Sequence, residues 1–154
     1  MNKFLIRRLA YSERPPMDLL VQADPDVDVV NQYISRGITY VGEIDGNVIG
    51  CYVLLKTRPM IVELVNVAVA ENYQGQGYGK QLIQHAVQQA RFMGYKSIEI
   101  GTGNSSIGQL ALYQKCGFRI VGVDLDFFTR HYKEPIFENG IQCRDMIRLV
   151  QHIE

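Results

Sequence analysis

The alternation of apolar and polar residues along the chain predicts a mixed protein of strands and helices. Runs rich in β-branched residues, typical of strands, are interspersed with segments whose apolar residues recur at helical spacing. The expected strands cover residues 3–9, 38–56 as a hairpin, 60–70, 96–103, 118–125 and 142–150, and the expected helices cover 12–37 in two pieces, 78–93 and 106–116. The aromatic stretch 126–140 has no clear period and is expected to be irregular.

Residues that favour turns and helix ends divide the first helical region into two pieces. The Asp24-Pro25 pair interrupts the pattern, because the residue before a proline is biased away from the helical conformation. Asp26 is suited to start the second piece, and Gly37 stands where a helix often ends on glycine. We therefore expect two short helices before the first hairpin.

The order of the expected elements is β-αα-βββ-α-β-α-ββ and predicts an α/β protein of the α+β type. Asp45-Gly46 favours a tight hairpin, because that turn needs positive φ angles. The helix over 78–93 connects two strands and predicts one parallel crossover in an otherwise antiparallel sheet. Its apolar residues share one side, so His85, on the polar side, is expected at the surface.

Composition narrows the classes of protein that the chain resembles. Its 154 residues, 47% of them hydrophobic, suit one domain over residues 1–154. Sixteen basic residues balance sixteen acidic ones, which argues against a nucleic-acid partner and against binding to an anionic membrane by bulk charge. The first 16 residues contain no apolar signal core, so we expect a soluble cytoplasmic protein. The three cysteines form no CxxC pair, and no ligand cluster indicates a metal.

A glycine-rich loop precedes the helix over 78–93 and has the chemistry of a phosphate site. The segment "QGQGYG" (74–79) fails the P-loop pattern, because Gln81 follows Lys80. It also fails the dinucleotide pattern, because Lys80 occupies the third glycine position. The remaining Q-x-x-G-x-G pattern lets backbone N–H groups at a helix start approach a pyrophosphate. Taken alone, the loop is also consistent with a turn that binds no ligand.

Two further motifs give the loop a context. The strand "ELVNVAV" (63–69) leads into it, and "LYQKCGF" (112–118) ends the next helix with the pattern Y-x-K-x-G-F. Together these motifs resemble the GNAT superfamily, the GCN5-related N-acetyltransferases, over most of the chain. The resemblance implies the acyl-CoA N-acyltransferase fold, a mixed sheet of about seven strands with about four helices. It implies acetyl-CoA as the donor and no metal.

The resemblance also implies where acetyl-CoA binds. Its pantetheine arm would lie like a strand between two splayed strands, paired with the backbone of Val67 and Val69, and its pyrophosphate would lie on the glycine loop. The implied cofactor-binding residues are Val67, Ala68, Val69, Gln74, Gly75, Gln76, Gly77, Tyr78, Gly79, Lys80, Asn104, Ser106 and Tyr113. The family often has asparagine seven residues before the tyrosine. Here that position is Ser106, and Asn104 lies two residues earlier.

Acetyl transfer needs a proton acceptor for the amine and a proton donor for the leaving thiolate. Tyr113 matches the family tyrosine and is the expected general acid, because a phenol and a thiol have similar pKa values. Glu63, eleven residues before Gln74, is the candidate general base, with a chain of water molecules as the alternative. Glu63 is expected to share a strand face with Val67. The backbone N–H of Val69 or a neighbour is the expected donor to the oxyanion.

The acceptor is expected to be a primary amine of a small molecule or a peptide, received by the two N-terminal helices and the tail. Carboxylates and aromatic rings are interleaved in the tail and suit a cation. They are Asp124, Asp126, Phe127, Phe128, Tyr132, Glu134, Phe137 and Glu138. The same rings suit a homodimer contact. A non-catalytic CoA-binding or protein-interaction module on the same fold is the alternative function.

Overall fold

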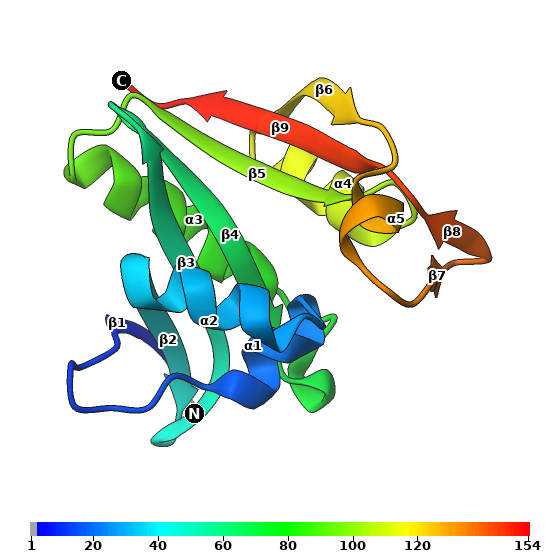
Figure 1. Cartoon of the computed structure of the whole chain (residues 1–154). Helices are drawn as coiled ribbons and strands as arrows, with labels where there is room; N and C mark the ends of the chain where they lie inside the picture. The colour runs from blue at the N-terminus through cyan, green and yellow to red at the C-terminus, as the bar shows by residue number, and fades with distance from the viewer. Residues whose placement is uncertain (1–2) are drawn as a thin grey trace.

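The computed structural model describes residues 3–154, so residues 1 and 2 of the predicted domain lie outside the described residues. The strands are β1 (Phe4–Arg8), β2 (Ile38–Ile44), β3 (Asn47–Arg58), β4 (Ile61–Val69), β5 (Ser97–Gly103), β6 (Arg119–Asp124), β7 (Ile136–Glu138), β8 (Ile141–Cys143) and β9 (Met146–His152) (Figure 1). The helices are α1 (Met17–Ala23), α2 (Val27–Arg36), α3 (Tyr78–Phe92), α4 (Ile107–Lys115) and α5 (Phe127–His131), with a 3-10 turn at Glu71–Tyr73.

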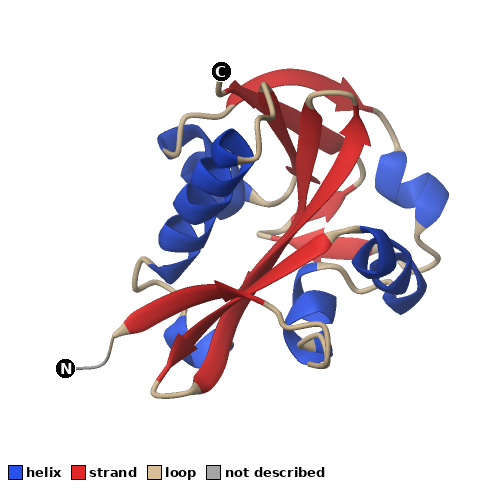
Figure 2. Ribbon diagram, turned by 90° about the vertical axis from the view of Figure 1, so that its left-hand side faces the viewer, coloured by secondary structure: helices blue, strands red, loops and turns tan. Residues whose placement is uncertain are grey.

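Seven strands form one mixed sheet in the order β1-β2-β3-β4-β5-β9-β6, while β7 and β8 form a separate hairpin. Neighbouring strands of the sheet are antiparallel except β4 and β5, which are parallel and joined through α3. Helices lie on both sides of the strands (Figure 2). The predicted seven-stranded mixed sheet with one parallel crossover is therefore confirmed.

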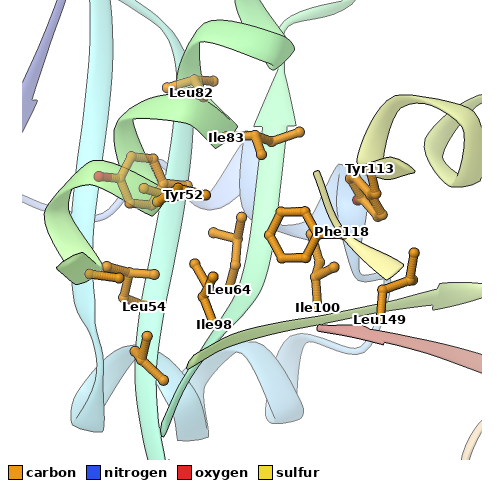
Figure 3. Close-up of a cluster of buried hydrophobic side chains, with 14 of the residues drawn as sticks. Tyr52, Leu54, Leu64, Leu82, Ile83, Ile98, Ile100, Tyr113, Phe118 and Leu149 are labelled. Carbon is orange, nitrogen blue, oxygen red and sulfur yellow. The ribbon is translucent and has the colours of Figure 1, made fainter. Parts of the chain in front are cut away.

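The sheet separates two apolar cores. On one face, α3 and α4 pack against the larger cluster, which includes Leu82, Phe118 and Ile98 (Figure 3). On the other face, α1 and α2 contribute Leu20 and Val30 to the smaller cluster. Because strand residues alternate between faces, each face of β4 looks onto a different core.

Local turn chemistry places the first elements as predicted. Asp45 and Gly46 have φ angles of 52° and 80°, as a tight hairpin turn requires. The Asp26 carboxylate accepts the backbone N–H groups of Asp28 and Val29, and so caps α2. Gly37 ends α2 with a φ of −97°, so no left-handed conformation explains the glycine. A Cβ there would lie 2.8 Å from the Leu54 carbonyl oxygen, so close packing against β3 requires it.

His85 is only partly exposed, whereas the helical pattern predicts a surface residue. Its Nδ1 lies 2.7 Å from the Tyr52 hydroxyl, and its ring also packs against Tyr40. Gln89, one turn further on, accepts a hydrogen bond from the Tyr40 hydroxyl at 3.3 Å. Burial lowers the pKa of His85. His85 and Gln89 therefore lie against β2 and β3, while Gln84 and Gln88 on the polar side of α3 are exposed.

The tail is more ordered than the sequence indicates. Residues 126–140 contain α5 and β7, and β8 completes a small hairpin with β7. The last strand of the sheet begins at Met146, whereas the apolar pattern predicts it from residue 142. The backbone N–H groups of Arg144 and Asp145 both donate to the Asn104 side-chain oxygen, at 2.8 and 2.9 Å. This long-range contact separates β8 from β9, and no local pattern reveals it.

Candidate active site

The site is built around two neighbouring strands that diverge. β4 and β5 pair only through residues 61–63 and 97–99. Beyond that point they separate, and the divergence is visible in Figure 1. We call the space between residues 64–69 of β4 and 100–103 of β5 the β4–β5 gap. The splayed pair that the family resemblance implies is therefore present.

The backbone of β4 presents free polar groups toward the β4–β5 gap. The N–H of Ala70 donates to the carbonyl of Ile49 in β3 at 2.7 Å. Backbone groups alternate in direction along a strand, so those of Val69 and Val67 point away from β3 and into the gap. The Val69 carbonyl is held by the side-chain amides of Gln22 and Gln74, both at 2.9 Å. The Val69 N–H and both backbone groups of Val67 are left facing the gap.

A bulge in β4 redirects its side chains. Leu64 lies opposite Leu54 and Asn66 lies opposite Val53, so Val65 is an extra residue in β4. Val67 then packs on the α3/α4 face, whereas Val65 packs on the α1/α2 face. The expectation that Glu63 and Val67 share one face of the strand is therefore wrong, because the bulge breaks the alternation between them.

The glycine loop ends in a helix start with open N–H groups. Gly75 and Gly77 have φ angles of 74° and 90°, which only glycine adopts readily. α3 begins at Tyr78 with no side-chain cap and no acidic residue in its first turn. The first N–H groups of a helix have no partner within the helix and carry partial positive charge. This geometry suits an anion.

Gly79 differs from the other two glycines of the loop. It lies within α3, and a Cβ there would be 3.8 Å from the side chains of Leu112 and Val69. The start of α3 therefore lies beside α4 and the end of β4. Gln74 in this loop uses its side chain to hold the Val69 carbonyl, and Lys80 is exposed.

Tyr113 lies on the α3/α4 face of the sheet. It projects from α4, is 6% exposed, and packs its ring against Phe118 with the ring centroids 6.4 Å apart (Figure 3). Burial is the main cause that raises the pKa of Tyr113, and the nearby Cys116 adds to it. The phenol therefore keeps its proton at neutral pH.

Glu63 lies on the other face, at the closed end of the β4–β5 gap. Its Cα is paired with Glu99 of β5, and Glu99 forms an ion pair of 2.8 Å with Arg58. Burial raises the pKa of Glu63, the charge of Arg148 opposes this, and the charge of Glu99 reinforces it. Tyr113 and Glu63 thus lie on opposite faces of the sheet.

Asn104 and Ser106 are bound to the tail. The Asn104 oxygen accepts the two N–H groups that separate β8 from β9, and its amide nitrogen donates to the Gln142 carbonyl at 3.1 Å. The Ser106 hydroxyl donates to the Glu138 carboxylate at 2.8 Å. These contacts fasten the β7–β8 hairpin to the start of α4.

A cavity of about 350 Å³ opens beside the β4–β5 gap. We call it the central cavity. Its walls come from the end of α1, from β4, β5 and the start of α4, and from the tail. The lining residues are Gln22, Ala23, Asp24, Pro25, Val65, Val67, Gly101, Thr102, Gly103, Ser106, Gln109, Phe128, Tyr132, Ile136, Glu138, Cys143 and Met146.

Only part of the expected acceptor surface reaches this cavity. Phe128, Tyr132 and Glu138 line it, as the tail composition suggests. Asp124 instead pairs with Arg130 at 2.7 Å, and Asp126 pairs with Arg144 at 3.2 Å. The remaining members, Phe127, Glu134 and Phe137, do not line the central cavity.

Asp24 is the site residue that sequence reasoning misses. It follows α1 and accepts hydrogen bonds from the Tyr132 hydroxyl at 2.9 Å, the Asp26 N–H at 3.2 Å and the Tyr33 hydroxyl at 3.4 Å. Burial raises the pKa of Asp24, and the bonds from Asp26 and Tyr132 oppose that rise. In the sequence Asp24 marks only a helix break, and its partner Tyr132 is 108 residues away.

Residues 3–154 meet neither the requirements of a metal site nor those of a membrane-spanning helix. No three His, Cys, Asp or Glu side chains in this range are grouped so that they could hold a metal ion. None of the helices in the same range combines the length and apolar character that crossing a membrane requires.

Comparison with known proteins identifies close relatives. The sequence model of the acetyltransferase (GNAT) family matches residues 7–118. An uncharacterized N-acetyltransferase of Bacillus subtilis (strain 168), YvbK, is 60% identical over 132 residues, covering 86% of this chain and 85% of that protein.

Solved structures with the same fold include one with the donor bound. An IAA acetyltransferase from Bacillus cereus is 53% identical, with a TM-score of 0.94, covering 97% of this chain and 99% of that one. A GNAT family acetyltransferase from Elizabethkingia anophelis with acetyl-CoA bound is 44% identical, with a TM-score of 0.95, covering 97% of each chain.

Proposed function

Because the chain belongs to the GNAT family and is an acetyl-CoA-dependent N-acetyltransferase, we propose that its acceptor is a primary amine of a small molecule or peptide. The amine would attack the thioester directly, with both substrates bound at once. The observation that carries this proposal is the β4–β5 gap. It opens onto the central cavity and lies beside the start of α3, so a donor and an acceptor can meet there.

The donor would occupy the gap as an additional strand. Its pantetheine amides would pair with the free backbone groups of Val67, and the Val69 N–H, on the other side of Ala68, would face the thioester carbonyl. Its pyrophosphate would accept the N–H groups at the start of α3. Support for this arrangement is the direction of the β4 backbone groups and the uncapped N-terminus of α3. The remaining loop residues that we assign to the donor site are Gln74, Gly75, Gln76, Gly77, Tyr78, Gly79 and Lys80.

Replacing Gly77 by alanine is expected to weaken acetyl-CoA binding. A side chain at φ 90° costs about 1 to 2 kcal/mol, so the loop shifts and displaces the N–H groups of the first turn. That cost corresponds to roughly a 5- to 30-fold increase in Kd. Calorimetric titration with acetyl-CoA measures it. Gly94→Ala is the matched control, because Gly94 has a φ of 88° at the opposite end of α3. An equal loss of affinity in both variants would contradict a specific role of the loop.

In the chemical step, the proton acceptor and the proton donor would lie on opposite faces of the sheet. Glu63, directly or through a water molecule, would take a proton from the amine, whose nitrogen then bonds to the thioester carbon. The carbonyl electrons move to oxygen, and the Val69 N–H would stabilise that oxyanion. When the carbonyl re-forms, the carbon–sulfur bond breaks and Tyr113 would give its proton to the thiolate, while the excess proton on the amide nitrogen would return to the Tyr113 oxygen. Glu63 lies two residues before Val65, which lines the central cavity.

Amine-dependent release of free thiol from acetyl-CoA tests the proposal. The panel contains aliphatic monoamines, diamines, amino acids and lysine peptides. We expect thiol release that rises with the concentration of at least one amine. Binding of acetyl-CoA without thiol release on any amine would favour the alternative, a non-catalytic CoA-binding or interaction module.

We further propose that the enzyme is a homodimer. β6 is an edge strand, and large apolar side chains on it and at its end are at least half exposed. They are Ile120, Val121, Val123 and Leu125, with exposed fractions of 50% to 68%. Covering such a patch favours self-association. Sedimentation equilibrium is expected to give twice the chain mass, and the mass of a single chain would contradict the proposal.

We place the enzyme in the cytoplasm. Cys51, Cys116 and Cys143 are free thiols, which a reducing compartment maintains. Fractionation of the cells that make the protein tests this placement, and recovery outside the cytoplasmic fraction would contradict it.

A further inference from the structure

The central cavity carries negative charge without a compensating cation. Its lining includes two carboxylates, Asp24 and Glu138, and none of its lining residues within 3–154 is a lysine, arginine or histidine. The two carboxylates come from segments more than a hundred residues apart in sequence, the corner between α1 and α2 and strand β7. A space lined in this way attracts a cation and repels an anion.

The Asp24 carboxylate is held in one orientation. Three donors point at it: the Asp26 N–H and the Tyr132 hydroxyl at Oδ1, and the Tyr33 hydroxyl at Oδ2. A carboxylate has about four acceptor positions, so one remains open for a ligand. The Tyr33 hydroxyl itself accepts the Asn66 amide at 2.8 Å, which orients it. Asp24 is thereby oriented to accept a hydrogen bond from a bound cation.

Glu138 is also oriented by hydrogen bonds. The hydroxyls of Ser105 and Ser106 both donate to its Oε1, at 3.0 and 2.8 Å. Both bonds converge on one oxygen, and Glu138 lines the cavity. The hairpin that carries it is anchored to the start of α4 by these bonds and by the Asn139 amide, which donates to the Ser105 carbonyl at 2.8 Å.

Aromatic rings add to the attraction of the cavity for a cation. Phe128 and Tyr132 both line it, and their ring centroids are 5.4 Å apart. Faces of such rings attract ammonium groups, most strongly where water is excluded. An aliphatic chain can pack along the same rings. The lining therefore suits a short hydrocarbon chain that carries positive charge.

Resting on the proposed function, we propose that the acceptor is a small aliphatic diamine or polyamine whose second ammonium group binds Asp24, with Glu138 adding to the negative field. The amine that attacks the thioester must be neutral, and a fixed carboxylate next to it would stabilise its protonated form. Three of the acceptor positions of Asp24 are already filled, so it is unsuited to take that proton. Its charge suits an ammonium group that stays protonated throughout the reaction.

Three acceptors of equal chain length test the inference: 1,4-diaminobutane, 1-aminobutane and 4-aminobutanoate. The diamine is expected to have a kcat/KM about 30-fold above that of the monoamine, the scale of one buried charge pair. The amino acid is expected to be the poorest, because its carboxylate faces two others. A lysine peptide, which offers a bulkier chain, is expected to react more slowly than the diamine.

Asp24→Asn removes the charge and keeps an oxygen for Tyr132. We expect the diamine's kcat/KM to fall about 30-fold, mainly through KM, so that its advantage over the monoamine nearly disappears. Glu138→Gln keeps an acceptor for the two serines. It is expected to lower the ratio of the diamine's kcat/KM to the monoamine's by a smaller factor than Asp24→Asn does. Asp28→Asn, an equal loss of charge on the exposed first turn of α2, is expected to leave the ratio unchanged.

The outcomes separate this inference from the proposed function. Equal kcat/KM values for the diamine and the monoamine in the native enzyme would overturn the inference while leaving amine acetylation intact. An unchanged diamine preference in both Asp24→Asn and Glu138→Gln would overturn it too. Thiol release with none of the amines, despite acetyl-CoA binding, would instead contradict the proposed function itself.

Discussion

Tyr113→Phe is expected to lower kcat about 100-fold or more while leaving acetyl-CoA binding nearly unchanged. Phenylalanine keeps the ring that packs against Phe118, so the cost is confined to the missing hydroxyl. Without that hydroxyl the thiolate must leave unprotonated, and general acid catalysis of this kind contributes about 100-fold to 10,000-fold. Single-turnover measurements of thiol release separate this chemical step from product release.

A matched variant distinguishes catalysis from packing. Tyr95 packs against the same apolar core from the end of α3 that lies away from the glycine loop. Tyr95→Phe is expected to retain full turnover, and both variants are expected to keep the native melting temperature within a few degrees. If Tyr113→Phe also turns over at the native rate, Tyr113 is a core residue and the general acid role is wrong.

Glu63→Gln is expected to lower kcat/KM about tenfold to 100-fold near neutral pH. Glu63 can accept a proton only when ionised, and burial raises its pKa above the ordinary glutamate value. Activity of the native enzyme should therefore fall as the pH drops through that raised pKa. In Glu63→Gln the defect should shrink as the pH rises, because more of the substrate amine is already neutral. The pH profile of kcat/KM for both enzymes measures this.

Glu99 provides the control for the pH dependence. Its charge raises the pKa of Glu63, and in the sheet the two residues are paired between β4 and β5. Glu99→Gln is therefore expected to move the acidic limb of the profile to lower pH without abolishing activity. If Glu63→Gln retains the native profile, the proton leaves through a chain of water molecules and Glu63 is not the base.

The features that sequence patterns predicted correctly are local ones. The Asp45-Gly46 hairpin, the Asp26 cap and the glycine turn each depend on backbone preferences of a few neighbouring residues. The apolar periods also sufficed for the strands of the seven-stranded sheet, because most of these strands carry buried apolar residues. Such features follow from steric and hydrogen-bonding rules that act within one element.

The features that sequence patterns missed depend on distant contacts. Nothing in residues 63–69 indicates the bulge at Val65, since the extra residue is defined only by its register with β3. The start of β9 depends on bonds from Asn104, and the role of Asp24 depends on Tyr132. In the last two cases a polar side chain finds its partner about forty or more residues away, which no periodic pattern encodes.

Quantifying both products of one reaction tests the central claim most directly. The enzyme is mixed with acetyl-CoA and 1,4-diaminobutane, and free CoA thiol and N-acetylated amine are measured in the same samples by mass spectrometry. Direct transfer predicts that the two appear in equal amounts and that both depend on the amine. Bound CoA with no acetylated amine, from this acceptor or from any other amine in the panel, would contradict the account.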